Sequence, residues 1–135
     1  MTQPSAPQPT EGLPEGTETA AAPVDPPTVT VEHPTPDTAR VVVVGELTAE
    51  ARRPLIRVVT DLLLGQDPPQ RLQLDLHGVD FLNPAGLSTV VQVHRMLEGR
   101  GSELTLAVGT TAVARPLQLS GLWHRFHVLD ERRGN

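Results

Sequence analysis

Apolar and polar residues alternate in several short stretches of the chain, and this alternation predicts strands. The clearest case is Leu72, Leu74 and Leu76, which are separated by Gln73 and Asp75. A period of two is typical of a strand with one face buried. Further stretches that alternate or are rich in β-branched residues lie at residues 28–32, 40–44, 103–108 and 128–129. We therefore expect a sheet of four to five strands.

Between these strands the apolar residues recur every three or four positions, which predicts helices. The first helix is expected at about residues 54–64, from the spacing of Leu55, Val58, Val59, Leu62 and Leu63. Its start is open. Thr48 is a plausible cap, but Pro54 would then lie deep inside the helix, so a start at Arg53 with Pro54 in the first position is at least as good.

A second helix is expected from Pro84 to about Glu98, where Gly99 and Gly101 stop it. Its inward residues are expected to be Leu87, Val90, Val91, His94 and Leu97. A short third helix follows residues 109–111 and ends at Ser120 and Gly121. Its inward residues are expected to be Val113, Leu117 and Leu119.

The order of strands and helices indicates an α/β domain with a mixed, mostly parallel sheet, because helices link successive strands. The first two strands are joined by a turn that contains Pro34 and Pro36, which should stop their pairing, and they are expected to be antiparallel. Polar residues point away from the apolar face at Gln73 and Asp75. Helices should therefore lie mainly on one face of the sheet.

Three glycine and asparagine positions predict the connections around the third strand. Gly45 is expected to end the second strand, and Gly78 to form a tight turn after which Val79, Phe81 and Leu82 return to the core. Asn83 should cap the second helix, since its side-chain oxygen can accept from an unpaired amide of the first turn. Pro84 suits the first helical position, because it has no N–H to leave unpaired.

Composition divides the chain into three parts. Residues 1–27 are acidic and rich in proline with few large apolar side chains, which predicts a disordered leader. Residues 28–130 should form one domain, and residues 131–135 a frayed tail. The apolar runs are too short to cross a bilayer and the chain does not begin like a signal peptide, so we expect a cytoplasmic protein.

Charge and residue types exclude several classes of function. The 11 basic residues are all arginine and form no stripe with interleaved aromatics, which argues against nucleic-acid binding. With no cysteine, a thiolate metal site and thiol catalysis are excluded. No glycine-rich phosphate loop and no serine nucleophile motif is present. We expect no cofactor.

The remaining polar and aromatic residues are read as structural. His124 and His127 lack acids at ligand spacing, so a metal site is not expected. His94 should be a part-buried, hydrogen-bonded side chain, and Asp75 and Asp80 are expected to bond to a turn. For Trp123 core packing is preferred, and a hot spot for a protein partner is the alternative.

Four segments together resemble the STAS domain, the family of bacterial anti-sigma factor antagonists. They are Val41-Val-Val-Val-Gly-Glu-Leu47, Leu74-Asp-Leu-His-Gly-Val-Asp-Phe-Leu82, Ala85-Gly-Leu87 and Leu117-Gln-Leu-Ser-Gly-Leu122. The resemblance covers about residues 28–130. It implies a non-enzymatic binding module that engages an anti-sigma factor, a serine kinase of the histidine-kinase-like ATPase fold, in partner switching that regulates transcription.

In that family the kinase phosphorylates the serine of an Asp-Ser-x-Gly motif at the start of the second helix. The present chain reads Asn83-Pro84-Ala85-Gly86, so proline occupies the phosphoacceptor position. Proline has no hydroxyl and can gain no phosphate charge. The family also often has aspartate where this chain has Thr48. The resemblance thus implies an intact helix start that has lost its covalent switch.

Two hypotheses follow for the partner-binding residues, which would be Asn83, Pro84, Ala85, Gly86, Leu87 and Ser88. In the preferred one the chain binds its partner regardless of phosphorylation. In the other, Ser88 substitutes as the phosphosite, one helical turn beyond Pro84, with Thr89 beside it. A different class of function is a ligand-binding or complex-subunit STAS domain, for example one associated with transport, in which no sigma factor is involved.

Overall fold

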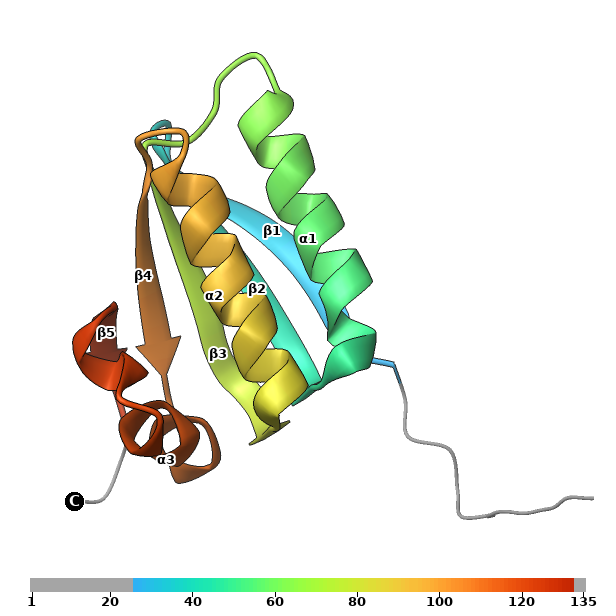
Figure 1. The fold of residues 1–135 in the computed structure, drawn as a ribbon. Helices are drawn as coiled ribbons and strands as arrows, with labels where there is room; N and C mark the ends of the chain where they lie inside the picture. Colours follow the sequence, from blue (N-terminus) through green and yellow to red (C-terminus); the bar gives the residue numbers. More distant parts are fainter. Residues whose placement is uncertain (1–25, 133–135) are drawn as a thin grey trace, which may run out of the picture.

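The structure is a computed structural model that describes residues 26–132. Most of the expected leader, residues 1–25, and the last part of the expected tail, residues 133–135, lie outside the described residues. The described part is a single α/β domain, as the sequence predicts. Figure 1 shows one sheet with two long helices laid over one of its faces.

Five strands form the sheet in the order β1-β2-β3-β4-β5. They are β1 (Thr28–Thr35), β2 (Thr38–Leu47), β3 (Arg71–Leu82), β4 (Glu103–Val108) and β5 (His127–Asp130). β1 is antiparallel to β2, and all other neighbours are parallel. The prediction of a mixed, mostly parallel sheet is therefore confirmed, and β2 lies inside the sheet, between β1 and β3.

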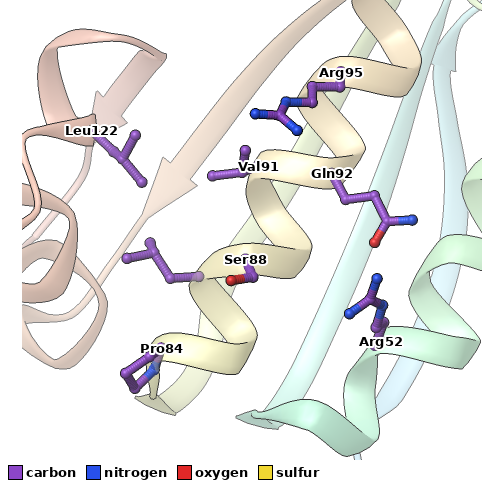
Figure 2. Close-up of a pocket in the computed structure, with 8 residues that line it drawn as sticks. Arg52, Pro84, Ser88, Val91, Gln92, Arg95 and Leu122 are labelled. Atoms are coloured by element: carbon purple, nitrogen blue, oxygen red, sulfur yellow. The ribbon is translucent and has the colours of Figure 1, made fainter.

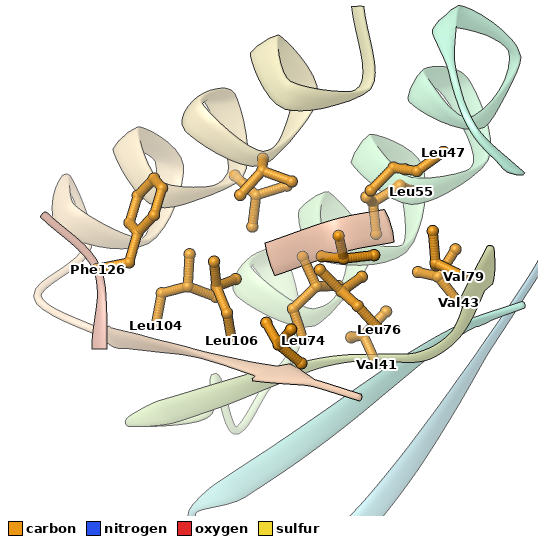
Figure 3. Packing of buried hydrophobic residues seen from close by; sticks show 14 of the residues in the cluster. Val41, Val43, Leu47, Leu55, Leu74, Leu76, Val79, Leu104, Leu106 and Phe126 are labelled. Atoms are coloured by element: carbon orange, nitrogen blue, oxygen red, sulfur yellow. The ribbon is translucent and has the colours of Figure 1, made fainter. Parts of the chain in front are cut away.

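The helices are α1 (Ala49–Leu64), α2 (Pro84–Glu98) and α3 (Thr111–Leu119), and a short 3₁₀ helix η2 (Leu122–His124) follows. α1 and α2 lie side by side on one face of the sheet, and α3 lies near the end of β4 (Figure 1). The core fills the space between this face and the helices (Figure 3). Its largest fully buried side chains include Leu47, Leu55, Leu74, Leu76 and Leu106.

α1 begins at Ala49, which is the earlier of the two starts that the sequence left open. The hydroxyl of Thr48 accepts a hydrogen bond from the Glu50 amide at 3.4 Å and caps the helix. Pro54 is the sixth residue of α1, where it removes one backbone hydrogen bond. The early turn is retained because it also buries Ala51 completely in the core. This burial and the cap offset the cost of the proline.

The expected tight turn at Gly78 is wrong, since β3 continues through it to Leu82. Gly78 does not adopt a positive φ. A Cβ there would instead lie 2.9 Å from Cγ2 of Val44 on β2, so glycine lets the strands pack without displacing the Val44 side chain. β3 carries one extra residue between its pairings with Val42 and Val44, and another further along. These bulges bend the strand without ending it.

Two other strand boundaries also differ from the prediction. Gly45 does not end β2 but lies within it at φ 116°, a conformation that favours glycine. β1 runs on to Thr35 in spite of Pro34, with an irregularity in its pairing between Glu32 and Thr35. An edge strand tolerates such a proline because one side of it has no partner strand.

The carboxylate of Asp37 closes the β1–β2 turn. It accepts hydrogen bonds from the hydroxyls of Thr35 at 2.8 Å and Thr38 at 3.2 Å. These bonds, that of Thr35 first, hold the pKa of Asp37 below its usual value. The backbone carbonyl of Asp37 accepts from the amides of Gln70 and Arg71, which ties the turn to the start of β3.

Three expectations about inward-facing residues are wrong. Phe81 is 48% exposed, whereas its neighbours Val79 and Leu82 are buried. Leu119, at the end of α3, is 76% exposed, because the buried side of that helix is formed by Val113, Ala114 and Leu117. On α2 the buried side of the helix is rotated relative to the expected one. The buried residues of α2 are Gly86, Thr89, Val90, Val93 and Leu97. Leu87 and Val91 are only half-buried, whereas Val90 and Leu97 are buried and His94 is part-buried, as expected.

Replacement of Pro54 by alanine should stabilise the protein by about 1–3 kcal/mol, because it restores a helical hydrogen bond and removes a steric clash. Urea unfolding followed by circular dichroism measures the change. Pro84→Ala is the matched control. Pro84 opens α2, where no such bond is lost, so this variant should change stability by less than about 1 kcal/mol. Equal effects of the two substitutions would contradict the account of α1.

Candidate functional site

The site predicted from the sequence lies where β3 ends and α2 begins. Asn83 caps α2 as expected: its side-chain oxygen accepts from the Gly86 amide at 2.9 Å. Its backbone carbonyl accepts from the Leu87 amide at 2.9 Å, and its own amide donates to the Leu47 carbonyl at 3.4 Å. Pro84 occupies the first helical position. The helix start is therefore held both by its own cap and by the end of β2.

Gly86 packs directly against the end of β2. A Cβ on Gly86 would lie 1.9 Å from the Leu47 carbonyl oxygen, so only glycine fits. In the sequence Gly86 is part of the Asn83-Pro84-Ala85-Gly86 motif. The structure explains why a glycine stands there, since the Leu47 carbonyl leaves no room for a side chain. Gly86 is buried, and its role at the site is to set the position of α2.

The other predicted site residues differ in how far solvent reaches them. Pro84 and Ser88 are exposed, and Asn83, Ala85 and Leu87 are half-buried. Thr89 is completely buried, and its hydroxyl donates to the Ala85 carbonyl at 3.1 Å. Among the hydroxyl groups proposed as substitutes for the missing serine, that of Ser88 is the one open to solvent.

A groove of about 700 Å³ runs along the exposed side of α2. Three predicted residues line it, Pro84, Leu87 and Ser88. The sequence did not identify the remaining lining residues, which come from α1, α2 and η2: Arg52, Val91, Gln92, Arg95 and Leu122. Figure 2 shows Leu122 across from Val91, and the Arg52 side chain reaching toward Gln92. The groove thus has an apolar floor with an arginine from each long helix.

A smaller hollow of about 390 Å³ adjoins this groove between α1 and α2. It shares Arg52 and Gln92 with the groove and adds Arg53, Ile56 and Arg57. No acidic residue lines either depression. None of the ion pairs formed among residues 26–132 uses Arg52, Arg53, Arg57 or Arg95. We call the groove and the hollow together the arginine groove. It can bind an acidic segment that carries apolar side chains.

The histidines and the acid pair lie away from this groove or on its margin. Asp75 accepts from the amide of His77 at 3.0 Å and from its Nδ1 at 2.7 Å, whereas Nε2 of His77 lies 3.0 Å from Glu131. This agrees with a local bonding role for Asp75, while Asp80 is exposed. Within residues 26–132 no cluster of histidine and acidic side chains could hold a metal ion.

Of the aromatic residues in the last part of the described chain, Phe126 contacts α2 and Trp123 contacts Arg132. The His94 ring packs edge-on against the Phe126 ring, at an angle of 75° and with the ring centroids 5.0 Å apart. Trp123 is half-buried, with the Arg132 guanidinium 5.7 Å from its ring centroid. Arg132 also donates to both carboxylate oxygens of Asp130 at 2.8 Å, and these bonds lower the pKa of Asp130.

Comparison with known proteins agrees with the fold described above. The family model described as Mlab, STAS domain, matches residues 31–130. No curated protein is similar enough to the chain to count as a match. In the part of the chain that the structure describes, no helix has both the length and the apolar character needed to cross a membrane.

Several solved structures are similar. An anti-sigma factor antagonist from Mycobacterium paratuberculosis has 25% identity and a TM-score of 0.65, with 76% of this chain and 84% of that chain covered. The antagonist SpoIIAA in its unphosphorylated form has 21% identity and a TM-score of 0.63, with coverages of 77% and 90%. The STAS domain of a SulP transporter from Vibrio cholerae has 22% identity and a TM-score of 0.54, with 64% of this chain and 68% of that chain covered.

Replacement of Gly86 by alanine should destabilise the protein by about 1–3 kcal/mol or more, because the new methyl group would overlap the Leu47 carbonyl and push α2 away from β2. Gly99→Ala is the matched control at the other end of α2. A Cβ there would lie 3.5 Å from the nearest carbonyl oxygen, an ordinary contact, so we expect no loss of stability. Thermal and urea unfolding of both variants measure the difference, and a stable Gly86→Ala protein would be incompatible with the described approach.

Proposed function

The chain belongs to the STAS domain family, and from this membership we propose that it is a non-enzymatic interaction module of the anti-sigma factor antagonist type. Its partner would be an anti-sigma factor, a serine kinase of the histidine-kinase-like ATPase fold. The observation that carries the proposal is the exposed start of α2, where Pro84, Leu87 and Ser88 line a groove. The 25% identity to an anti-sigma factor antagonist supports the same assignment.

The partner would contact the first turns of α2 and the residues beside them. Pro84 and Ser88 are exposed, and Leu87, Val91 and Leu122 give the groove an apolar floor. An apolar floor flanked by arginines is the kind of surface that protein partners use, since arginine and well-packed apolar side chains dominate binding energy. Asn83 and Gly86 would act indirectly, by holding the helix start in place.

The proposed module would bind without being regulated at the usual position. Pro84 stands where the family's phosphoacceptor serine is expected, and proline has no hydroxyl to accept a phosphate. The cap formed by Asn83 preserves the helix start but brings no negative charge. Binding would therefore be controlled by the amount or accessibility of the protein, and not by a phosphate on residue 84.

A second candidate is a subunit of a transport-associated complex. The description of the matching family model as Mlab favours it, and the fold is shared by a SulP transporter STAS domain from Vibrio cholerae and a sulfate transporter family protein from Wolinella succinogenes. At 22% and 15% identity these two structures share the fold alone. The identity of the bound partner separates the two candidates: a soluble kinase-like ATPase supports the first, and a component of a membrane transporter supports the second.

Ser88→Arg should weaken binding of the partner by at least about tenfold, which corresponds to about 1.4 kcal/mol. The reason is that a long charged side chain would fill the groove, while Ser88 itself is exposed and its replacement leaves the core intact. The partner is captured on the tagged full chain from the source cells, identified by mass spectrometry, and its affinity measured by titration.

Thr111→Arg provides the control for this experiment. Thr111 is also an exposed residue at the start of a helix, but it does not line the groove. The control variant should bind within about twofold of the original protein, since surface substitutions usually change energies by less than about 0.5 kcal/mol. If the two variants bind equally well, the partner does not use the α2 face.

Pro84→Ser should create a phosphorylation site that the original chain lacks. After incubation with the captured kinase-like partner and ATP, phosphopeptide mapping should find phosphate on residue 84 of the variant, and none on residues 83–89 of the original chain. Ser88→Ala in both backgrounds controls for the neighbouring hydroxyl. Phosphate on Ser88 of the original chain would show that the substitute site is used, and the proposal of an unregulated module would be wrong.

A further inference from the structure

Acidic and basic residues are distributed unevenly between the two parts of the chain. Residues 1–25 contain four acids, Glu11, Glu15, Glu18 and Asp25, and no arginine, lysine or histidine. The rest of the chain holds the other 12 of the 16 acids together with all 11 arginines. The acidic surplus of the protein therefore comes mainly from its first 25 residues.

The arginine groove has the opposite character. Arg52, Arg53 and Arg57 of α1 and Arg95 of α2 line it without any acid, and no ion pair within residues 26–132 neutralises them. The apolar floor of Leu87, Val91 and Leu122 lies between the two helices and η2. A complementary ligand would combine carboxylates with at least one apolar side chain.

The first 25 residues join the domain close to this groove. Pro27 packs on Gly45, near the end of β2, where a Cβ on residue 45 would lie 3.3 Å from the Pro27 Cα. Two residues further along β2, about 7 Å away, the carbonyl of Leu47 touches Gly86 at the start of α2. Figure 1 shows the described chain entering at the end of the sheet where α1 also begins.

Residues 11–18 have the acidic and apolar side chains that the arginine groove would bind, and the chain that follows them is long enough to reach the groove. It carries Glu11, Glu15 and Glu18 around the apolar pair Leu13 and Pro14. The chain between Glu18 and Pro26 can span up to about 26–29 Å when extended, which exceeds the distance from Gly45 to the start of α2. Because a short tether gives an effective concentration of the order of 1 mM, even a weak intrinsic affinity suffices for occupancy.

We propose that residues 11–18 bind in cis in the arginine groove, with Leu13 against the apolar floor and the three glutamates paired with Arg52, Arg95 and the neighbouring arginines. The occupant is a segment of this chain itself. If the partner uses the α2 face, as the proposed function holds, the segment competes with it for Pro84, Leu87 and Ser88. The chain would then carry its own inhibitor in place of the missing phosphate switch.

Paramagnetic relaxation enhancement in the full chain tests the proposal. The chain has no cysteine, so Thr10→Cys attaches a single nitroxide next to the segment. At low salt the amides of residues 85–95 should lose at least about half of their peak intensity, as expected for a segment that is half-occupied or more at millimolar effective concentration. The loss should largely disappear at about 1 M salt, where the screening length is about 3 Å.

Three sets of substitutions serve as matched comparisons. Glu11→Gln, Glu15→Gln and Glu18→Gln together keep the label and the length of the chain but remove the charges, and should restore the peak intensities. Arg52→Gln with Arg95→Gln should do the same. Arg100→Gln with Arg115→Gln, at exposed arginines that do not line the groove, should leave the intensity loss unchanged.

Two results would overturn the proposal. One is an intensity loss that is the same in the charged and neutralised segments, which would mean that the segment only passes near α2. The other is an intensity loss in a mixture of isotope-labelled chains without nitroxide and nitroxide-labelled chains without isotope, which would assign the groove to a second copy. No partner is present in the experiment, so its result is separate from that of the proposed function.

Discussion

The contact between the Leu47 carbonyl and Gly86 determines how the rest of the domain is arranged. It brings the end of β2 against the first turn of α2 at a distance that excludes any side chain at residue 86. The Asn83 amide donates to the same carbonyl, and the Asn83 side chain caps the helix. With its start fixed in this way, α2 lies beside α1 on one face of the sheet, and the groove between the helices and η2 follows from that placement.

Much of the fold could be predicted because it depends on local patterns. The alternation from Leu72 to Leu76 specifies a strand, and the Asn83-Pro84 pair specifies a helix start, without contacts to distant residues. The errors occur where distant contacts decide. Gly78 looks like a turn residue in the sequence, but in the structure it lies within β3 and packs closely against Val44. Pro54 looks like the first residue of a helix, but the Thr48 cap and the burial of Ala51 place the start of α1 before it.

The candidate site could be predicted only in part, for the same reason. Pro84, Leu87 and Ser88 are adjacent in the sequence and were found by their motif, whereas Arg52 and Leu122 reach the groove from other elements. The mistaken assignment of Leu87 and Val91 to the core is informative. The buried positions in the first part of α2 include the small residues Gly86 and Thr89, which lets the helix start approach the sheet closely, while Leu87 and Val91 lie at the groove.

The irregular pairing of β1 has a consequence for how this protein behaves at high concentration. Regular pairing of β1 with β2 ends at Glu32, and Pro34 lies in the irregular stretch that follows. The opposite edge of the sheet, β5, has only four residues. Short or interrupted edges are poor templates for strand addition by another molecule. The domain can therefore leave the arginine groove open to solvent while its backbone edges resist polymerisation into extended sheets.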